Sequence, residues 1–283
     1  MKIATAGVVG SGTMGAGIAQ RCAMYHYPVV LVDSQPGQLE SARAAMERSL
    51  GKFVEKGRLT PESKRAVLER IEFCLELERV AECDLVVEAV PENAELKKQV
   101  FRKLDGLCRQ DTILASNTSS IPLTPLAEAT RRPERVLGIH FMNPVPLMKL
   151  VEMIPARQTA EEVFRVCEKF VVSLDCEVVR SRDAPGFIVN RVLMPMINEA
   201  VEAYAAGVAS VKDIDRAMML GTNQPMGPLA LADVIGLDVV LSILQTLHAG
   251  LDGDRYRPSP LLEDYVRQNR LGRKTGKGFY DYR

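Results

Sequence analysis

The chain has 283 residues, of which 47% are hydrophobic and 25% charged, and 36 lysines and arginines balance 36 aspartates and glutamates. This length predicts one large or two moderate domains, and the composition is typical of a globular protein that can bury a sizeable core. Partners such as nucleic acid or a membrane surface require a basic excess or a basic stripe, so we expect neither.

The cysteines and histidines argue against a metal site and against a disulfide framework. Six cysteines form no C-x-x-C pair, and only three histidines are present. Buried thiols in a reducing compartment are the better interpretation of this pattern. No signal peptide is evident at the start of the sequence, and no apolar stretch reaches the length of a membrane span. We therefore expect a cytoplasmic protein without a metal.

The first part of the chain alternates between predicted strands and helices. Short apolar runs of buried-strand character are separated by segments with helical spacing, and this alternation is typical of a doubly wound α/β sheet. The predicted strands are 3–9, 27–33, 84–90, 112–116, 135–141, 148–154 and 176–180. The predicted helices are 13–25, 36–56, 61–70, 93–105 and 159–173.

The pattern changes after residues 181–186, where the sequence reads SRDAPG. From Phe187 onward the chain has helical periodicity and almost no strand signal, with Gly and Pro at the breaks. We therefore predict a Rossmann-type domain over 1–183, followed by a smaller all-α domain over 184–283.

A glycine-rich motif joins the first predicted strand to the first helix. Gly10, Gly12 and Gly15 form a G-x-G-x-x-G pattern, and Asp33 ends the next predicted strand. In this context the glycines permit a tight turn, close approach of the backbone to a pyrophosphate, and close helix packing. A carboxylate at Asp33 can accept hydrogen bonds from the adenosine ribose and repels a 2′-phosphate, so NAD is favoured over NADP. A glycine-rich turn without a ligand is the weaker interpretation.

A histidine and a glutamate stand on two consecutive predicted strands. If these strands pair antiparallel about Pro146, then His140 and Glu152 oppose each other on one face. A carboxylate beside an imidazole fixes its tautomer and stabilises its charged form, which suits a general base. Without the glutamate, a single histidine at the end of a strand is just as often structural.

Several motifs together resemble the L-3-hydroxyacyl-CoA dehydrogenase family, and especially its short bacterial 3-hydroxybutyryl-CoA members. The resemblance spans essentially the whole chain and is carried by VVGSGTMGAGIAQ, VVEAVPEN, ASNTSS, GIHFMNPVPLMKLVE, DAPGFIVNR, LGTNQPMGPLALADVIGLD and GRKTGKGFY. It implies an NAD-dependent oxidoreductase that interconverts short-chain L-3-hydroxyacyl-CoA and 3-ketoacyl-CoA. It also implies a homodimer formed through the C-terminal domain, and a place in fatty-acid or butanoate metabolism whose direction stays open.

The resemblance also implies roles for individual residues. His140 would be the base and Glu152 its partner, while Ser119 and Asn190 would orient the substrate oxygens. The implied cofactor contacts are the motif residues Gly10, Ser11, Gly12, Thr13, Met14 and Gly15, together with Asp33, Glu92, Lys97, Asn117 and Lys274. The implied contacts with CoA are Ser49, Lys56 and Ser119.

Simpler interpretations stay open for some of these residues. Lys56 could be a solvated surface lysine, Ser119 a turn residue, and Asn190 a cap or a bridge between domains. At the level of the whole protein, three alternatives remain: a dehydrogenase of a free hydroxy or sugar acid of the L-gulonate type, a catalytically idle NAD-binding structural protein, and a nucleotide-sensing module.

Overall fold

The computed structural model describes residues 2–283 and divides into two compact units, Met1–Ala184 and Pro185–Arg283. The first unit contains all the named strands, and the second is built from helices. Each unit has its own hydrophobic core.

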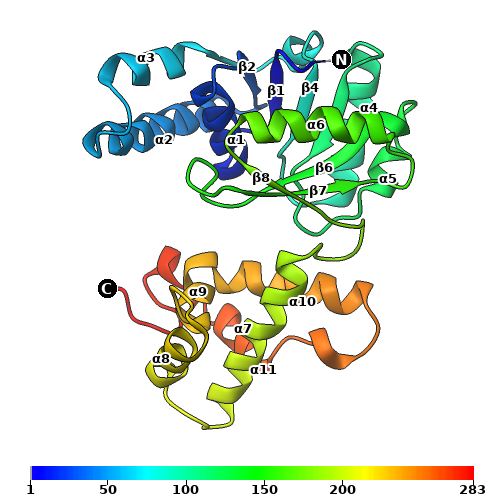
Figure 1. Ribbon diagram of the computed structural model, residues 1–283. Coiled ribbons are helices and arrows are strands. Elements are labelled where there is room, and N and C mark those ends of the chain that lie inside the picture. The colour runs from blue at the N-terminus through cyan, green and yellow to red at the C-terminus, as the bar shows by residue number, and fades with distance from the viewer. Residues whose placement is uncertain (1) are drawn as a thin grey trace. The chain divides into compact units, whose positions relative to one another are not determined.

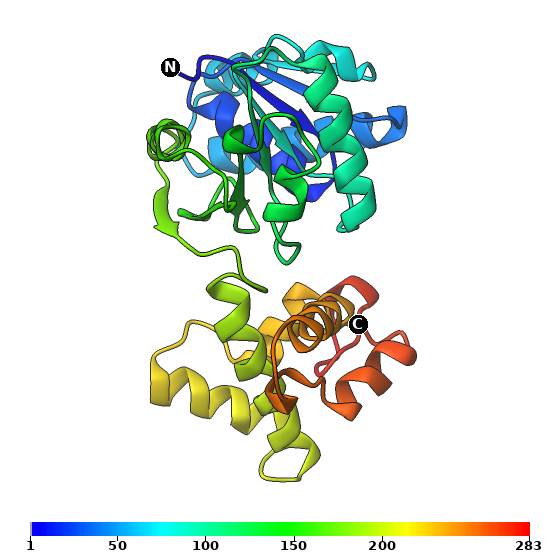
Figure 2. The same cartoon turned by 90° about the vertical axis from the view of Figure 1, so that its right-hand side faces the viewer.

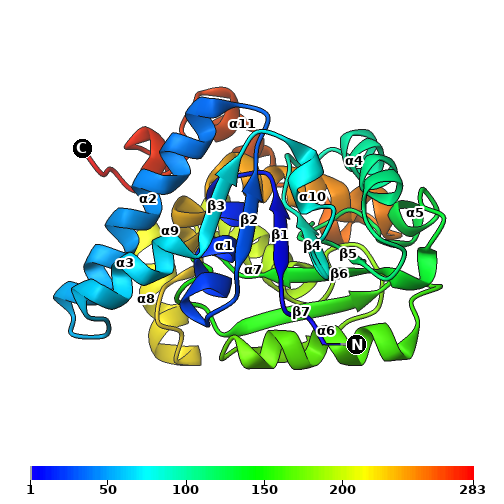
Figure 3. The same cartoon turned by 90° about the horizontal axis from the view of Figure 1, so that it is seen from above.

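The first unit is organised around one eight-stranded sheet with the strand order β3-β2-β1-β4-β5-β6-β7-β8 (Figure 3). All neighbouring strands pair parallel except β6 and β7, which are antiparallel. The strands are β1 (Ala6–Val9), β2 (Val29–Val32), β3 (Ile71–Cys74), β4 (Leu85–Glu88), β5 (Ile113–Ser116), β6 (Val136–Phe141), β7 (Leu150–Pro155) and β8 (Glu177–Arg180). The predicted Rossmann-type doubly wound sheet is confirmed, although β3 was not predicted.

The helices of this unit cover the sheet, and α6 packs against β7 and β8 (Figure 1). Because a parallel sheet is covered on both faces, its strands are apolar throughout rather than alternating, as in the wholly buried β1. Side-chain caps fix two helix starts: Thr60 accepts from Ser63 N at α3, and Asn93 accepts from Leu96 N at α4. The helices are α1 (Thr13–Met24), α2 (Pro36–Glu55), α3 (Pro61–Glu69), α4 (Ala94–Leu107), α5 (Thr124–Ala127) and α6 (Glu161–Ser173).

The second unit is helical, as the yellow-green to red part of Figure 2 shows. Its helices are α7 (Val189–Ala205), α8 (Val211–Thr222), α9 (Pro228–Ile235), α10 (Leu237–Gly250) and α11 (Pro260–Arg267). Among residues 2–283, no individual helix has the length and apolar character needed to cross a bilayer; only the pair α9 and α10, bent by 98°, passes that test jointly.

Two buried carboxylates fasten the segment 272–283 to this helical unit. Asp233 accepts from the backbone N–H groups of Phe279 and Tyr280, at 3.0 and 2.9 Å. Asp215 accepts from the hydroxyl of Tyr280 at 2.7 Å. Burial raises the pKa of Asp233 above its usual range, although the hydrogen bonds from this segment oppose the rise.

Candidate active site

Most of the predicted site residues of the first unit gather at one edge of the sheet. Strands β1, β2, β4, β5 and β6 are mutually parallel, so their carboxyl ends meet at that edge. In doubly wound folds, ligands bind outside the carboxyl ends of the strands. This edge carries the glycine motif, Asp33, Glu92, Asn117, Ser119 and His140.

The glycine motif forms the turn between β1 and α1, and its shape depends on the absence of side chains. Gly10 has φ +99°, and a Cβ atom there would lie 2.7 Å from the carbonyl oxygen of Ala89. A Cβ on Gly15 would lie 1.7 Å from the carbonyl oxygen of Gly10. Gly12, the N-cap of α1, would meet nothing within 4 Å. The backbone can thus be approached closely at the positive end of α1, which fits a pyrophosphate.

Ser11, Thr13 and Met14 complete this turn, and Ser11 is bound to the carboxylate of Asp33. Asp33 Oδ2 accepts from the backbone N–H and the hydroxyl of Ser11, at 2.8 and 2.9 Å. Asp33 Oδ1 accepts from Gln35 N at 3.0 Å. Asp33 directly follows β2, and its carboxylate holds the glycine turn in place.

His140 and Glu152 face each other across β6 and β7, as predicted from the sequence. The two residues are direct partners in the antiparallel register. His140 Nδ1 lies 2.8 Å from Glu152 Oε2, and both side chains are buried. With Glu152 ionised, Nδ1–H donates to the carboxylate, which leaves Nε2 as the nitrogen able to accept a proton.

The polar loop after β5 lies beside this pair. Asn117 Oδ1 accepts from the backbone N–H of Phe141, the residue after His140, at 2.9 Å. Ser119 follows in the turn 118–120, and its backbone N–H donates to Glu92 at 3.0 Å. The ends of β5 and β6 are therefore joined by a side chain at the point where the predicted base stands.

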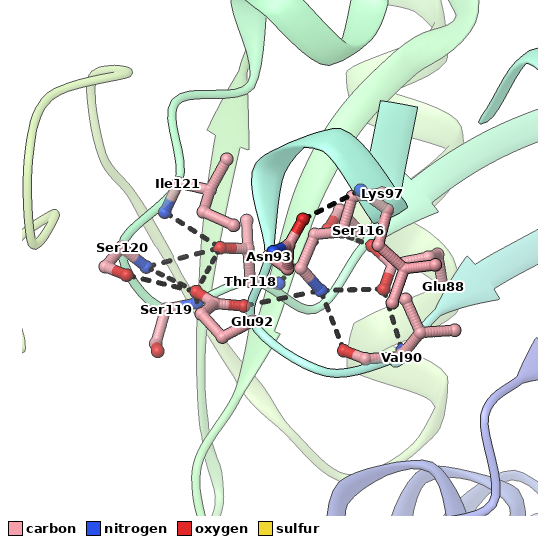
Figure 4. Close-up of polar contacts among 11 residues, drawn as sticks. Glu88, Val90, Glu92, Asn93, Lys97, Ser116, Thr118, Ser119, Ser120 and Ile121 are labelled. Carbon is pink, nitrogen blue, oxygen red and sulfur yellow. Dashed lines mark hydrogen bonds and ion pairs between the residues drawn. The ribbon is translucent and has the colours of Figure 1, made fainter. Parts of the chain in front are cut away.

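Glu92 and Lys97 belong to a larger polar network that also includes Glu88 and Ser116 (Figure 4), and all of these except Glu92 are buried. Sequence reasoning missed Glu88 and Ser116. One signal was available: Lys97 precedes Phe101 by one helical turn, which places it on the apolar stripe of α4 instead of its solvent face.

A buried arginine, which the sequence did not single out, fixes the loop after β6. Arg21, on α1, donates to the carbonyl oxygens of Pro146 and Leu174, at 3.1 and 2.8 Å. One turn earlier, a Cβ on Gly17 would come within 2.9 Å of Val145. The helix that begins at the glycine motif is therefore packed directly against the loop that follows His140.

The remaining predicted residues lie elsewhere. Ser49, on α2, accepts a hydrogen bond from Gln20 Nε2 at 3.0 Å, and exposed Lys56 is the C-cap residue of the same helix. Asn190 and Lys274 belong to the second unit. Asn190 is buried in the first turn of α7, and Lys274 donates to Asp238 Oδ2 at 2.6 Å.

Residues 2–283 contain no group of three or more His, Cys, Asp or Glu side chains placed to hold a metal ion. Gln224, in the motif GTNQPMGP, donates to the sulfur of Met196 at 3.4 Å.

Comparison with known proteins identifies the family. The model of the 3-hydroxyacyl-CoA dehydrogenase NAD binding domain matches residues 5–184, and the model of the 3-hydroxyacyl-CoA dehydrogenase C-terminal domain matches residues 186–282. The chain belongs to the 3-hydroxyacyl-CoA dehydrogenase family. The predictions of an NAD-dependent enzyme and of this family are thereby confirmed.

Three relatives illustrate how closely the chain follows other members of the 3-hydroxyacyl-CoA dehydrogenase family. A 3-hydroxybutyryl-CoA dehydrogenase of Bradyrhizobium diazoefficiens is 50% identical over 98% of this chain and 94% of its own length. The crystal structure of (S)-3-hydroxybutyryl-CoA dehydrogenase PaaH1 from Ralstonia eutropha covers both chains completely, with a TM-score of 0.95 and 42% identity. The structure of FadB2 from M. tuberculosis also covers both completely, with a TM-score of 0.98 and 38% identity.

Proposed function

We propose that this 3-hydroxyacyl-CoA dehydrogenase acts on short-chain substrates, oxidising the 3-hydroxyl group of L-3-hydroxybutyryl-CoA or reducing acetoacetyl-CoA. The names of the relatives support a substrate with a short acyl chain. The observation that carries the chemistry is the buried contact of His140 with Glu152, at the same edge of the sheet as the glycine turn. Together they supply a general base next to a dinucleotide site, which is what alcohol oxidation by hydride transfer needs.

The residues at the sheet edge have different roles in the proposed reaction. Bound NAD would supply the hydride acceptor, held by the glycine turn and Asp33. His140 Nε2 takes the proton of the hydroxyl group, and Glu152 stabilises the imidazolium that forms. Ser119 and Asn190 orient the substrate oxygens by hydrogen bonding. Asn117, whose oxygen is already engaged, offers its amide N–H groups toward the nicotinamide side.

Contacts farther from the reacting atoms complete the proposal. Ser49 and Lys56 on α2 contact CoA, and a lysine suits the several phosphate charges of that molecule. Glu92 contributes to the cofactor side. We assign Lys274 a cofactor contact as well, because its bond to Asp238 leaves it with N–H groups to donate.

We also propose that the protein is a cytoplasmic homodimer without a nucleic-acid or membrane partner. All six cysteines are free thiols, which is consistent with a reducing compartment. Large apolar side chains are exposed on the helical unit, among them Val192, Val208 and Leu220. Light scattering on the purified protein measures the mass in solution, and a monomer at micromolar concentration would contradict the dimer.

The decisive test follows the absorbance of the reduced coenzyme in three separate reactions. These are NADH with acetoacetyl-CoA, NADH with free acetoacetate, and NADPH with acetoacetyl-CoA. We expect fast loss of NADH with the thioester alone. His140→Gln should abolish most turnover, and His248→Gln, on α10, serves as the matched control. NADH binding without turnover of any CoA ester would refute the proposal and leave a free-acid dehydrogenase or an idle binding protein.

A further inference from the structure

Lys97 is buried inside the first unit, where three oxygen atoms lie around its ammonium group. Its ammonium group lies 2.7 Å from Glu88 Oε1, 3.1 Å from the carbonyl oxygen of Val90 and 3.3 Å from Glu92 Oε2. Its side chain is 1% exposed. Hydrogen bonds to Glu88 and to Val90 use two of its three N–H donors, and Glu92 adds an ion pair. The ammonium group is therefore held between two carboxylates.

The two carboxylates on either side of Lys97 serve different strands. Glu88 ends β4, and its Oε2 accepts from the hydroxyl of Ser116, the last residue of β5, at 2.6 Å. Glu88 Oε1 also accepts from Val90 N at 2.8 Å. This carboxylate is wholly buried, and burial raises its pKa, although the charge of Lys97 opposes the rise. Glu88 therefore ties together the ends of β4 and β5.

Glu92 transmits the position of Lys97 to the turn that follows β5. Its Oε1 accepts from the hydroxyl of Thr118 at 2.5 Å and from the backbone N–H groups of Ser119 and Ser120 at 3.0 and 3.1 Å. The hydroxyl of Ser120 adds a fourth donor at 3.1 Å. Burial would raise the pKa of Glu92, but Lys97 and these donors outweigh it and hold the pKa below its usual range.

Figure 4 shows the consequence: the Lys97 ammonium lies between the two carboxylates, and Glu92 turns its other oxygen toward residues 118–120. We propose that Glu88 and Lys97 are positioning residues, which act through Glu92 to set the turn that presents Ser119 to the substrate. This inference rests on the proposed role of Ser119.

The test compares Lys97→Met, Glu88→Gln and the double variant. In Lys97→Met, the carboxylates of Glu88 and Glu92 face each other without a cation, so the turn shifts. In the double variant only Glu92 stays charged, and its four donors in the turn still satisfy it. Misplacement by about 1 Å can cost about 100-fold, so we expect kcat/KM for acetoacetyl-CoA to fall at least about 30-fold in Lys97→Met. We expect the double variant to recover at least about fivefold of that loss.

The matched control is Arg132→Met, which removes the cation from Asp105, a buried carboxylate near the other end of α4. It should lower the melting temperature and leave kcat/KM of the folded enzyme unchanged. If Lys97→Met behaved in the same way, the pair would be merely structural and the proposal would fail.

Two further outcomes would overturn the proposal. If Lys97 contacted the cofactor directly, both Lys97→Met and the double variant would lose that contact. NADH binding, measured by fluorescence titration, would then be weakened equally in the two variants. Additive losses in the double variant would likewise refute the coupling. If Lys97→Met does not fold, Ser116→Ala is the substitute variant, since it removes one hydrogen bond to Glu88. We expect its kcat/KM to be about three- to tenfold lower than that of the wild type. An unchanged kcat/KM would refute the proposed positioning role.

Wild-type turnover of acetoacetyl-CoA is measured first. Its absence would contradict the proposed function, whereas normal wild-type turnover with no coupling between the variants would contradict the positioning pair alone.

Discussion

The exchange Glu152→Gln tests how much the buried carboxylate contributes to proton removal by His140. The amide keeps the shape of the side chain and can still accept from Nδ1–H across the 2.8 Å contact, but it carries no charge. A hydrogen bond to a charged group contributes about 1.5–3 kcal/mol and a neutral one about 0.5–1.5 kcal/mol. The imidazolium that forms during oxidation therefore loses about 1–2 kcal/mol of stabilisation, which corresponds to about a 5- to 30-fold lower kcat.

The assay follows NADH formation from L-3-hydroxybutyryl-CoA and NAD, with the rate referred to active sites counted by NADH binding. The KM values should change by about twofold or less, because the contact matters mainly in the transition state. Glu177→Gln, an exposed position on β8 in the same sheet, is the matched control and should leave kcat unchanged. A wild-type kcat in folded Glu152→Gln enzyme would refute the proposed partnership of Glu152 with His140.

Three other substitutions test contacts within each of the two units. Gly15→Ala places a methyl group 1.7 Å from the carbonyl oxygen of the first motif glycine, so α1 must move; we expect NADH affinity, measured by titration, to fall at least about tenfold. Arg132→Met leaves Asp105 with only an exposed arginine as a partner, and we expect denaturant unfolding to show a loss of about 3 kcal/mol. Tyr280→Phe removes a donor from buried Asp215 and should cost about 1 kcal/mol of the helical unit's stability. Unchanged NADH affinity in the first case, or unchanged unfolding midpoints in the other two, would contradict these assignments.

The parts of the site that local sequence determines could be predicted. The facing of His140 and Glu152 follows from a short loop centred on Pro146 and from the two-residue period of strands, and the register confirms it. The glycine turn could be predicted as well, because its glycines and their spacing can be read directly from the sequence. The strand β3 was missed because a single residue separates it from α3 and it contains exposed Glu72, so no separate apolar run marks it in the sequence.

The buried network around Lys97 could not be derived in the same way. Periodicity places Lys97 on the packed face of α4, but a charged residue is rarely buried without a partner, and the sequence does not reveal one. Glu88 ends a strand, and Glu92 lies in the loop before α4. Only the folded chain shows that both carboxylates converge on one ammonium group.

The contact between Asp33 and Ser11 links two properties that could otherwise vary independently: the coenzyme choice that we propose for Asp33, and the shape of the glycine turn. Removing the carboxylate to admit a 2′-phosphate also deprives the Ser11 backbone and hydroxyl of their acceptor. A route from NAD to NADP, whether by selection or by design, therefore has to include a second change that gives Ser11 a new partner.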